Sequence, residues 1–226
     1  GQALLPGAVD YESALAAADP ELDPDLVASW SPDDRYVLYT GGTTGMPKGV
    51  LWRQGDFLPA ALAFRRRDGE EFPSVAEVVA AAQPGARLRA LPAAPVMHGA
   101  AHWNALSAWL AGGTIVVQDQ PHHLDPADVF ATCERERVTS LLIVGDAFAR
   151  PLVDELRRRP RDLGALRFLL TGGAILSAST KAEILDLLPG VTIVDILGSS
   201  ESGRQGVTST SVASDEGSTT GRFAPT

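Results

Sequence analysis

The chain has 226 residues, of which 45% are hydrophobic and 21% charged. This balance is typical of a globular protein with one sizeable core, and it excludes a disordered or membrane-embedded chain. The net charge of −9 argues against a nucleic-acid-binding protein, whose surface is normally basic. No apolar run approaches the length of a membrane span, and a single cysteine, Cys133, excludes a disulfide framework and favours the cytoplasm.

Residues 1–35 are rich in alanine, proline and acidic residues, and we expect them to form a lead-in segment. From residue 36 onward, short apolar runs alternate with segments of helical periodicity. The expected strands are Tyr36–Tyr39, Val50–Trp52, Arg87–Leu91, Thr114–Val117, Thr139–Val144, Arg167–Leu170 and Val191–Ile196. The expected helices are Asp56–Arg67, Ser74–Ala82, His102–Ala111, Pro126–Arg137, Ala147–Arg158 and Ser179–Leu188.

This alternation predicts an α/β fold with a mainly parallel sheet and helices on both faces. The last stretch, Ser199–Thr226, is dominated by serine, threonine and glycine, which predicts a loop. Cys133 lies in a helical pattern and is interpreted as a structural thiol. Lys181 lies on an amphipathic helix and is expected at the surface.

The segment Thr40–Gly49 joins the first two expected strands and contains four glycines, three threonines and one lysine. Glycine allows backbone amides to turn toward a ligand, and successive amides with hydroxyl groups and a lysine form an anion site. The segment differs from a Walker A loop, because Lys48 is followed by Gly49 and a strand. A hairpin turn that binds nothing is the alternative. The predicted phosphate-binding residues are Thr40, Gly41, Gly42, Thr43, Thr44, Gly45 and Lys48.

Two further loops follow strands of the expected sheet, where ligands bind in open α/β folds. Gly172, Gly173 and Ala174 follow one strand, and such small residues either border a ligand or allow close helix packing. The segment Leu197–Gly203 follows the next strand and carries one carboxylate, Glu201. Mg²⁺ bound with nucleotide phosphates uses one or two carboxylates, so Glu201 is a candidate metal ligand.

Two other chemistries have partial signatures in the sequence. His98 and His102 are four residues apart, but Gly99 stands where a zinc protease has its glutamate, so a metal site there is disfavoured. The segment around Ser200 nearly matches the nucleophile elbow of serine hydrolases, but Ser202 replaces the final glycine. A serine hydrolase therefore remains a minor alternative.

The string TGGTTGMPKGV of residues 40–50, the Gly-Gly-Ala segment and the Gly-Ser-Ser-Glu segment together resemble the motifs of adenylate-forming enzymes, in family order. Within that family the resemblance is to acyl-CoA synthetases, and the strings LWRQGDF, VMHGAAHW and IVGDAFARP are similar to actinobacterial fatty-acid and sterol side-chain ligases. The usual family residues are serine at position 41, threonine at 200 and an aromatic residue at 197, where this chain has Gly41, Ser200 and Leu197.

The resemblance implies that residues 36–226 are part of the large N-terminal AMP-binding domain, with the C-terminal domain absent. It implies roles for Lys48 and the glycine-rich loop at the ATP phosphates, for Glu201 at Mg²⁺, and for His98 beside the substrate carboxylate. Nucleotide contacts are implied for Gly172, Gly173, Ala174, Gly198, Ser199 and Ser200.

The implied reaction joins a fatty or other hydrophobic carboxylic acid to CoA through an acyl-adenylate, with ATP, Mg²⁺ and CoA taking part. The acyl pocket is expected among His98, Val144–Phe148 and Gly172–Ala174. The family lysine that contacts the reacting groups lies in the absent domain, so we expect this chain to bind nucleotide without full turnover. The alternative is a nucleotide-binding module without catalysis.

Overall fold

The computed structural model describes residues 4–41, 45–82, 87–212 and 223–225. The helices are α1 (Tyr11–Ala17), α2 (Pro24–Ser29), α3 (Gln54–Asp56), the π-helix η1 (Phe57–Ala61), α4 (Val75–Ala81), α5 (Gly99–Leu110), α6 (Pro126–Arg135), α7 (Gly145–Arg158) and α8 (Ala178–Leu187). The strands are β1 (Arg35–Thr40), β2 (Lys48–Arg53), β3 (Arg89–Pro92), β4 (Thr114–Ile115), β5 (Ser140–Ile143), β6 (Phe168–Gly172), β7 (Thr192–Ser199), β8 (Gly203–Thr210) and β9 (Ala224–Pro225).

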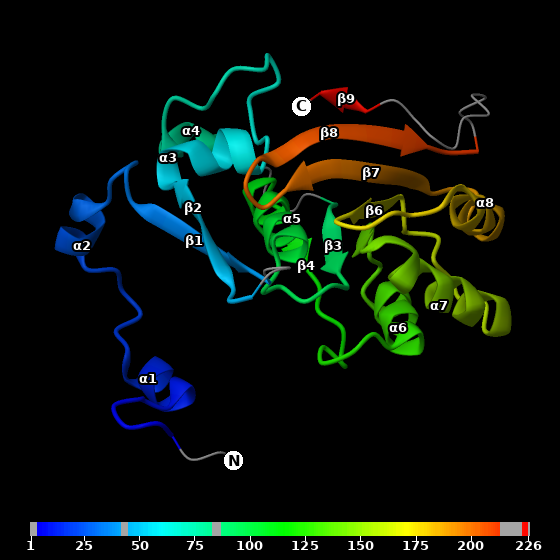
Figure 1. Ribbon diagram of the computed structural model, residues 1–226, viewed down its shortest axis with the longest axis horizontal. Helices are drawn as coiled ribbons and strands as arrows, with labels where there is room; N and C mark the ends of the chain where they lie inside the picture. Colours follow the sequence, from blue (N-terminus) through cyan, green and yellow to red (C-terminus); the bar gives the residue numbers. More distant parts are fainter. Residues whose placement is uncertain (1–3, 42–44, 83–86, 213–222, 226) are drawn as a thin grey trace.

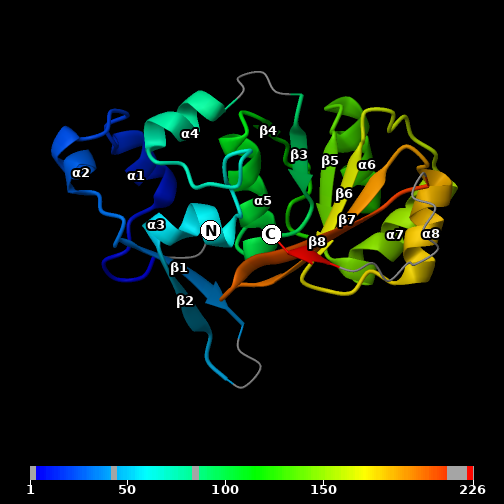
Figure 2. The same cartoon turned by 90° about the horizontal axis from the view of Figure 1, so that it is seen from above.

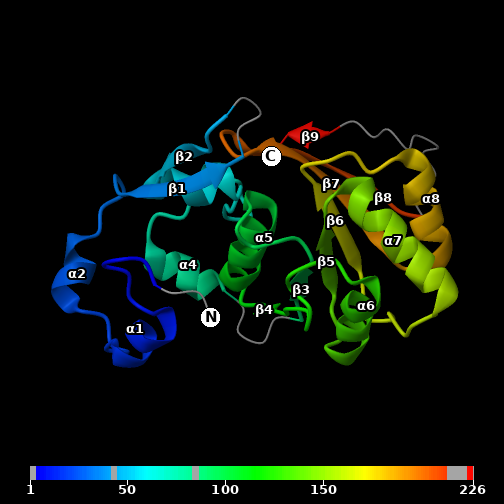
Figure 3. The same cartoon turned by 60° about the horizontal axis from the view of Figure 1, so that its bottom comes forward.

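Seven strands form one sheet in the order β4-β3-β5-β6-β7-β8-β9, and β1 and β2 form a separate antiparallel hairpin (Figure 1). The strands from β4 to β7 are parallel, while β8 and β9 are antiparallel to their neighbours. Helices α6, α7 and α8 lie on one side of the sheet and α5 on the other (Figures 2 and 3). The expected α/β fold with a mainly parallel sheet and helices on both faces is therefore confirmed.

The two sides of the parallel strands differ in their side chains because successive residues of a strand point to opposite faces. We call the side under α6–α8 the closed face; it carries Leu141, Ile143, Leu169 and Ile193 in the main apolar cluster. We call the α5 side the open face; it carries Leu142, Leu170, Val194 and Ile196, which border a cavity. The alternation therefore places the main apolar cluster on one side of the strands and the cavity on the other.

Cys133 of α6 belongs to the closed-face cluster and is 2% exposed. Burial raises the pKa of its thiol to about 12, so the thiol stays protonated at neutral pH. The interpretation of Cys133 as a structural thiol agrees with this environment.

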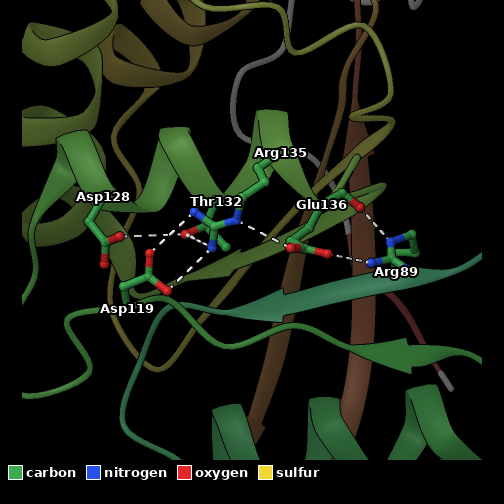
Figure 4. A network of polar contacts seen from close by, with 6 residues as sticks. All are labelled: Arg89, Asp119, Asp128, Thr132, Arg135 and Glu136. Atoms are coloured by element: carbon green, nitrogen blue, oxygen red, sulfur yellow. Dashed lines mark hydrogen bonds and ion pairs between the residues drawn. The ribbon is translucent and has the colours of Figure 1, made fainter.

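A polar network ties β3 to α6 near the β4 edge of the sheet (Figure 4). Arg89 Nη2 lies 2.9 Å from Glu136 Oε2, and its Nε also donates to the Glu136 carbonyl. Arg135 contacts Glu136 and, at 3.2 Å, Asp119 on the preceding loop. Exposed ion pairs contribute little singly, but this network joins β3, the end of α6 and the loop that carries Asp119.

The expectation that Lys181 lies at the surface is wrong. Lys181 is 5% exposed, and its Nζ lies 2.8 Å from Asp195 Oδ2 of β7. The pair fixes α8 to the closed face. Helical periodicity could not reveal it, because the partner is on a neighbouring strand.

The expected loop Ser199–Thr226 is also wrong in part, because it contains β8 and β9. Strand β8 pairs with β7 along most of its length, with a bulge at Leu197/Gly198. Its serine and threonine residues hid the strand, since a polar composition is also typical of loops. This segment forms a strand because its backbone pairs with that of β7.

The expected helix Asp56–Arg67 is shorter than predicted. The chain forms α3 and then the wide turn η1, closed by a hydrogen bond from Leu62 N to Phe57 O. Ala63 then adopts a positive φ of 47°, which ends the helix. Phe57, Ala61 and Leu62 are buried against the hairpin and α5, so packing rather than periodicity sets these bounds.

Candidate functional site

The cavity on the open face lies between the sheet, α5 and the β1–β2 hairpin and has a volume of about 990 Å³. Its walls include Leu142, Leu170, Val194 and Ile196 from the sheet, and Gly99, Ala100, Trp103, Asn104, Ser107 and Ala108 from α5. Pockets of this size accommodate small molecules and cofactors.

The cavity has two chemically different ends. At the carboxyl ends of the strands its lining includes Gly172, Gly173 and Glu201, together with Lys48 of the hairpin. At the opposite end it reaches Ser140, the first residue of β5, and Ala108 near the end of α5. The first end carries the charged side chains of Lys48 and Glu201, while the strip between the ends is mostly apolar.

Three of the predicted phosphate-binding residues line the cavity, and they lie at or next to the tip of the β1–β2 hairpin. Thr40 ends β1 and Lys48 begins β2, and both line the cavity with Gly41. The Thr40 hydroxyl donates to the Lys48 carbonyl at 3.4 Å. Gly45 is exposed and is not among the lining residues. Gly42, Thr43 and Thr44 lie outside the described residues.

The Glu201 side chain lies on the turn between β7 and β8. Gly198, Ser199, Ser200 and Glu201 all line the cavity. The Ser199 hydroxyl accepts hydrogen bonds from the backbone N–H groups of Glu201 and Ser202, both at 3.2 Å. The turn is thus shaped by its own serine and leaves the exposed Glu201 carboxylate available to a ligand.

The Gly-Gly-Ala segment leads from β6 toward α8. Gly172 and Gly173 line the cavity, whereas Ala174 is exposed and is not among the lining residues. Asp146 of α7 holds the end of this segment, because its Oδ1 accepts hydrogen bonds from Ser177 N at 2.9 Å and Ser177 Oγ at 3.2 Å. Hydrogen bonds lower the pKa of Asp146, and the one donated by the Ser177 backbone N–H has the largest effect.

His98 is the N-cap residue of α5 and is exposed. The following residues Gly99 and Ala100 line the cavity, but His98 is not among the lining residues. The expected acyl-pocket residues Val144 and Phe148 instead pack in a small apolar cluster with Ala101. Residues of α5 therefore line the cavity, whereas the sequence analysis expected the acyl pocket to include residues of the β5–α7 turn.

Several lining residues gave no motif in the sequence. Trp103, Asn104 and Ser107 follow one face of α5, and Arg204 follows the Glu201 turn. The helical spacing of the three α5 residues is the signal that could have identified them. Arg204 is half-buried and donates to the Ala63 carbonyl at 3.3 Å, and burial lowers its pKa.

The alternative chemistries find little support at this site. The described part of the chain contains no group of three or more His, Cys, Asp or Glu side chains that could hold a metal ion on their own. The cavity lining, as far as the structure describes it, includes Ser200 but no histidine. A Mg²⁺ site with Glu201 remains consistent, because Mg²⁺ can take its other ligands from phosphate and water. In the same described residues, no helix is long and apolar enough to cross a membrane.

Comparison with known proteins connects this geometry to one family. The AMP-binding enzyme family model matches residues 4–226. The chain is 46% identical over 208 residues to the medium-chain acyl-CoA ligase Mig of Mycobacterium avium, covering 91% of this chain and 37% of that protein. It is 36% identical over 210 residues to the 3-oxocholest-4-en-26-oate–CoA ligase of Rhodococcus rhodochrous, covering 89% of this chain and 36% of that protein.

Solved structures resemble the fold. The N-terminal domain of FACL13 from Mycobacterium tuberculosis superimposes with a TM-score of 0.62 at 19% identity, covering 84% of this chain and 42% of that chain. The chain spans about a third of the length of the curated relatives it matches, 37% and 36% in the two named above. The match along residues 4–226 shows that the chain belongs to the AMP-binding enzyme family.

Proposed function

We propose that this chain is the nucleotide-binding part of an ATP-dependent acid–CoA ligase that activates a fatty or other hydrophobic carboxylic acid. The observation that carries the proposal is the joint placement of Lys48, Gly172, Gly173 and Glu201 at one end of a largely apolar cavity. Relatives that are named as medium-chain and sterol-acid CoA ligases support it.

The charged end of the cavity suits the triphosphate of ATP. Lys48 supplies a positive charge, and the exposed Gly41 would supply a backbone N–H donor. Glu201 would hold Mg²⁺, which neutralises phosphate charge when bound. Phosphoryl transfer needs positioning and electrostatic stabilisation more than covalent help, and these residues provide both.

The apolar strip suits the tail of the acid. Leu142, Leu170 and Ala108 line it, and burial of an apolar tail contributes about 0.8 kcal/mol for each CH₂ group. With the tail along this strip, the carboxylate would face the nucleotide end. His98 lies at the start of α5 near that end, and we keep it as the proposed neighbour of the carboxylate.

The proposed reaction has two steps. The carboxylate oxygen attacks the α-phosphorus of ATP, and the bond from this phosphorus to the oxygen that bridges to the β-phosphate breaks. Pyrophosphate departs, and an acyl-adenylate remains. The CoA thiol then attacks the acyl carbon, loses its proton, and AMP leaves. We assign the activity to the cytoplasm, with the acid, ATP and CoA as partners, and expect the chain to bind nucleotide.

Calorimetric titration of Mg·ATP into the chain tests the proposal. Wild type should bind saturably, and Lys48→Ala and Glu201→Ala should each weaken binding by about tenfold or more, since charge-assisted contacts contribute about 1.5–3 kcal/mol. Arg157→Ala and Glu183→Ala are matched controls, because they remove one cation and one carboxylate from a 2.8 Å ion pair between α7 and α8. Absence of binding by wild type, or equal weakening by all four variants, would contradict the proposal.

A further inference from the structure

Trp52 of β2 connects the hairpin that carries Lys48 to the turn that carries Glu201. Its indole Nε1 donates a 2.8 Å hydrogen bond to the carbonyl of Ser200, although the two residues are 148 positions apart. Trp52 is half-buried and is not among the cavity-lining residues. The Trp52 indole is therefore positioned to hold the turn and not to contact a ligand in the cavity.

Aromatic packing fixes the direction of this indole. Trp52 meets Phe57 and Trp103 edge to face, with ring centroids 6.4 and 6.3 Å away. Phe57 in turn packs on Tyr36 at 4.5 Å, and Tyr36 is the β1 neighbour of Trp52 in the hairpin register. Edge-to-face pairs of this kind add stabilisation beyond area burial, so the indole cannot turn away without breaking the cluster.

The hydrogen bonds of Ser199 shape the Glu201 turn. Two contacts with the segment that follows the hairpin strand β2, or with β2 itself, hold the turn in position. Gly203, which closes the turn, has a φ of +70°, and a Cβ there would lie 2.4 Å from the carbonyl oxygen of Ala60 in η1. The second contact is the Trp52 bond. Both contacts are made by residues 52–61, a segment that continues along the chain from Lys48 in β2.

We propose that Trp52 is a positioning residue that couples the metal ligand Glu201 to the phosphate site at Lys48. A phosphate bound at Lys48 would hold the hairpin in place and, through the indole, the Ser200 carbonyl and the neighbouring carboxylate that would receive Mg²⁺. The reverse holds equally, because coupling between two binding sites is reciprocal. The inference rests on the proposed function, since it requires nucleotide and metal to bind at this cavity.

The test measures ATP affinity of the chain with Mg²⁺ and with EDTA, and takes their ratio as the metal enhancement. Trp52→Phe keeps an aromatic ring but has no N–H donor. We expect it to reduce the enhancement by about fivefold, the effect of one lost hydrogen bond, while ATP affinity in EDTA stays unchanged. Glu201→Gln should remove the enhancement, and the double variant Trp52→Phe/Glu201→Gln should lose no more than Glu201→Gln alone.

Tyr36→Phe is the matched control, because it removes the 3.2 Å bond between Trp103 Nε1 and the Tyr36 hydroxyl in the same cluster and leaves Ser200 untouched. Its metal enhancement should equal that of wild type. Replacement of Trp52 by benzothienylalanine, which has sulfur in place of the N–H, separates the hydrogen bond from packing and decides the test if Trp52→Phe does not fold.

A wild-type enhancement in the benzothienylalanine protein would overturn the coupling and leave the proposed function intact. An equal loss in Tyr36→Phe and Trp52→Phe would also overturn it, because the effect would then come from the cluster as a whole. Failure of wild type to bind ATP, or the same affinity with and without Mg²⁺, would overturn the proposed function and this inference with it.

Discussion

The closed and open faces of β5, β6 and β7 belong to the same strands, yet they differ in what covers them. On the closed face, Leu141, Leu169 and Ile193 are at most 4% exposed beneath three helices. On the open face, Leu170, Val194 and Ile196 are only partly buried and border the cavity. Because the closed face is packed beneath α6, α7 and α8, the open face of the same strands can border a cavity without exposing that core.

The largest expected effect comes from breaking the ion pair on the closed face. Lys181→Met leaves Asp195 as an uncompensated charge, since the side chain of Asp195 is 14% exposed. We expect a loss of about 3–5 kcal/mol in the free energy of unfolding, measured by urea denaturation. The double variant Lys181→Met/Asp195→Leu should recover much of it. A loss below about 1 kcal/mol in Lys181→Met would show that the pair behaves like a surface pair.

A smaller effect distinguishes the two faces directly. Leu169 and Leu170 are adjacent in β6 and point to opposite faces. Leu169→Ala should cost about 3 kcal/mol because it opens a void in a closed core. Leu170→Ala should cost about 1 kcal/mol, since Leu170 already borders a cavity. Urea unfolding with an unchanged m-value checks both, and equal losses would contradict the comparison.

The smallest effect concerns Asp146 of α7, which holds Ser177, the N-cap residue of α8, on the closed face. The Ser177 backbone hydrogen bond lowers the pKa of Asp146 below its ordinary value of 3.8. A carboxylate with a lowered pKa stabilises the fold at pH values above 3.8, and this contribution disappears as the pH falls through the native pKa. The Tm difference between wild type and Asp146→Asn should be constant from about pH 5 to 8 and shrink below about pH 3.8. A constant difference down to pH 2 would exclude this role.

The sequence allowed the parallel part of the fold to be predicted, because apolar strands separated by helices have few other solutions. It also indicated that the loops at Gly172 and Glu201 lie together, since the carboxyl ends of parallel strands share one edge. Lys48, on the separate hairpin, was grouped with them only through the resemblance to adenylate-forming enzymes. These residues do line one cavity.

Other features depend on partners that local patterns cannot reveal. Strand β8 is polar and becomes a strand because β7 offers it hydrogen bonds. Lys181 is buried because Asp195 lies opposite, and Trp52 contacts a carbonyl 148 residues away. Likewise, Val144 and Phe148 pack in a cluster with Ala101 of α5 and are not among the cavity-lining residues, a contact that the sequence around them does not indicate.

Cys133 gives the closed face a chemical reporter. It is the only cysteine among the 226 residues, and in the native state it is both buried and protonated. A thiol-specific reagent can therefore modify the chain only when α6 separates from the sheet, so the labelling rate measures how often that face opens. Nucleotide on the opposite side of the sheet should slow this labelling if the two faces form one cooperative unit.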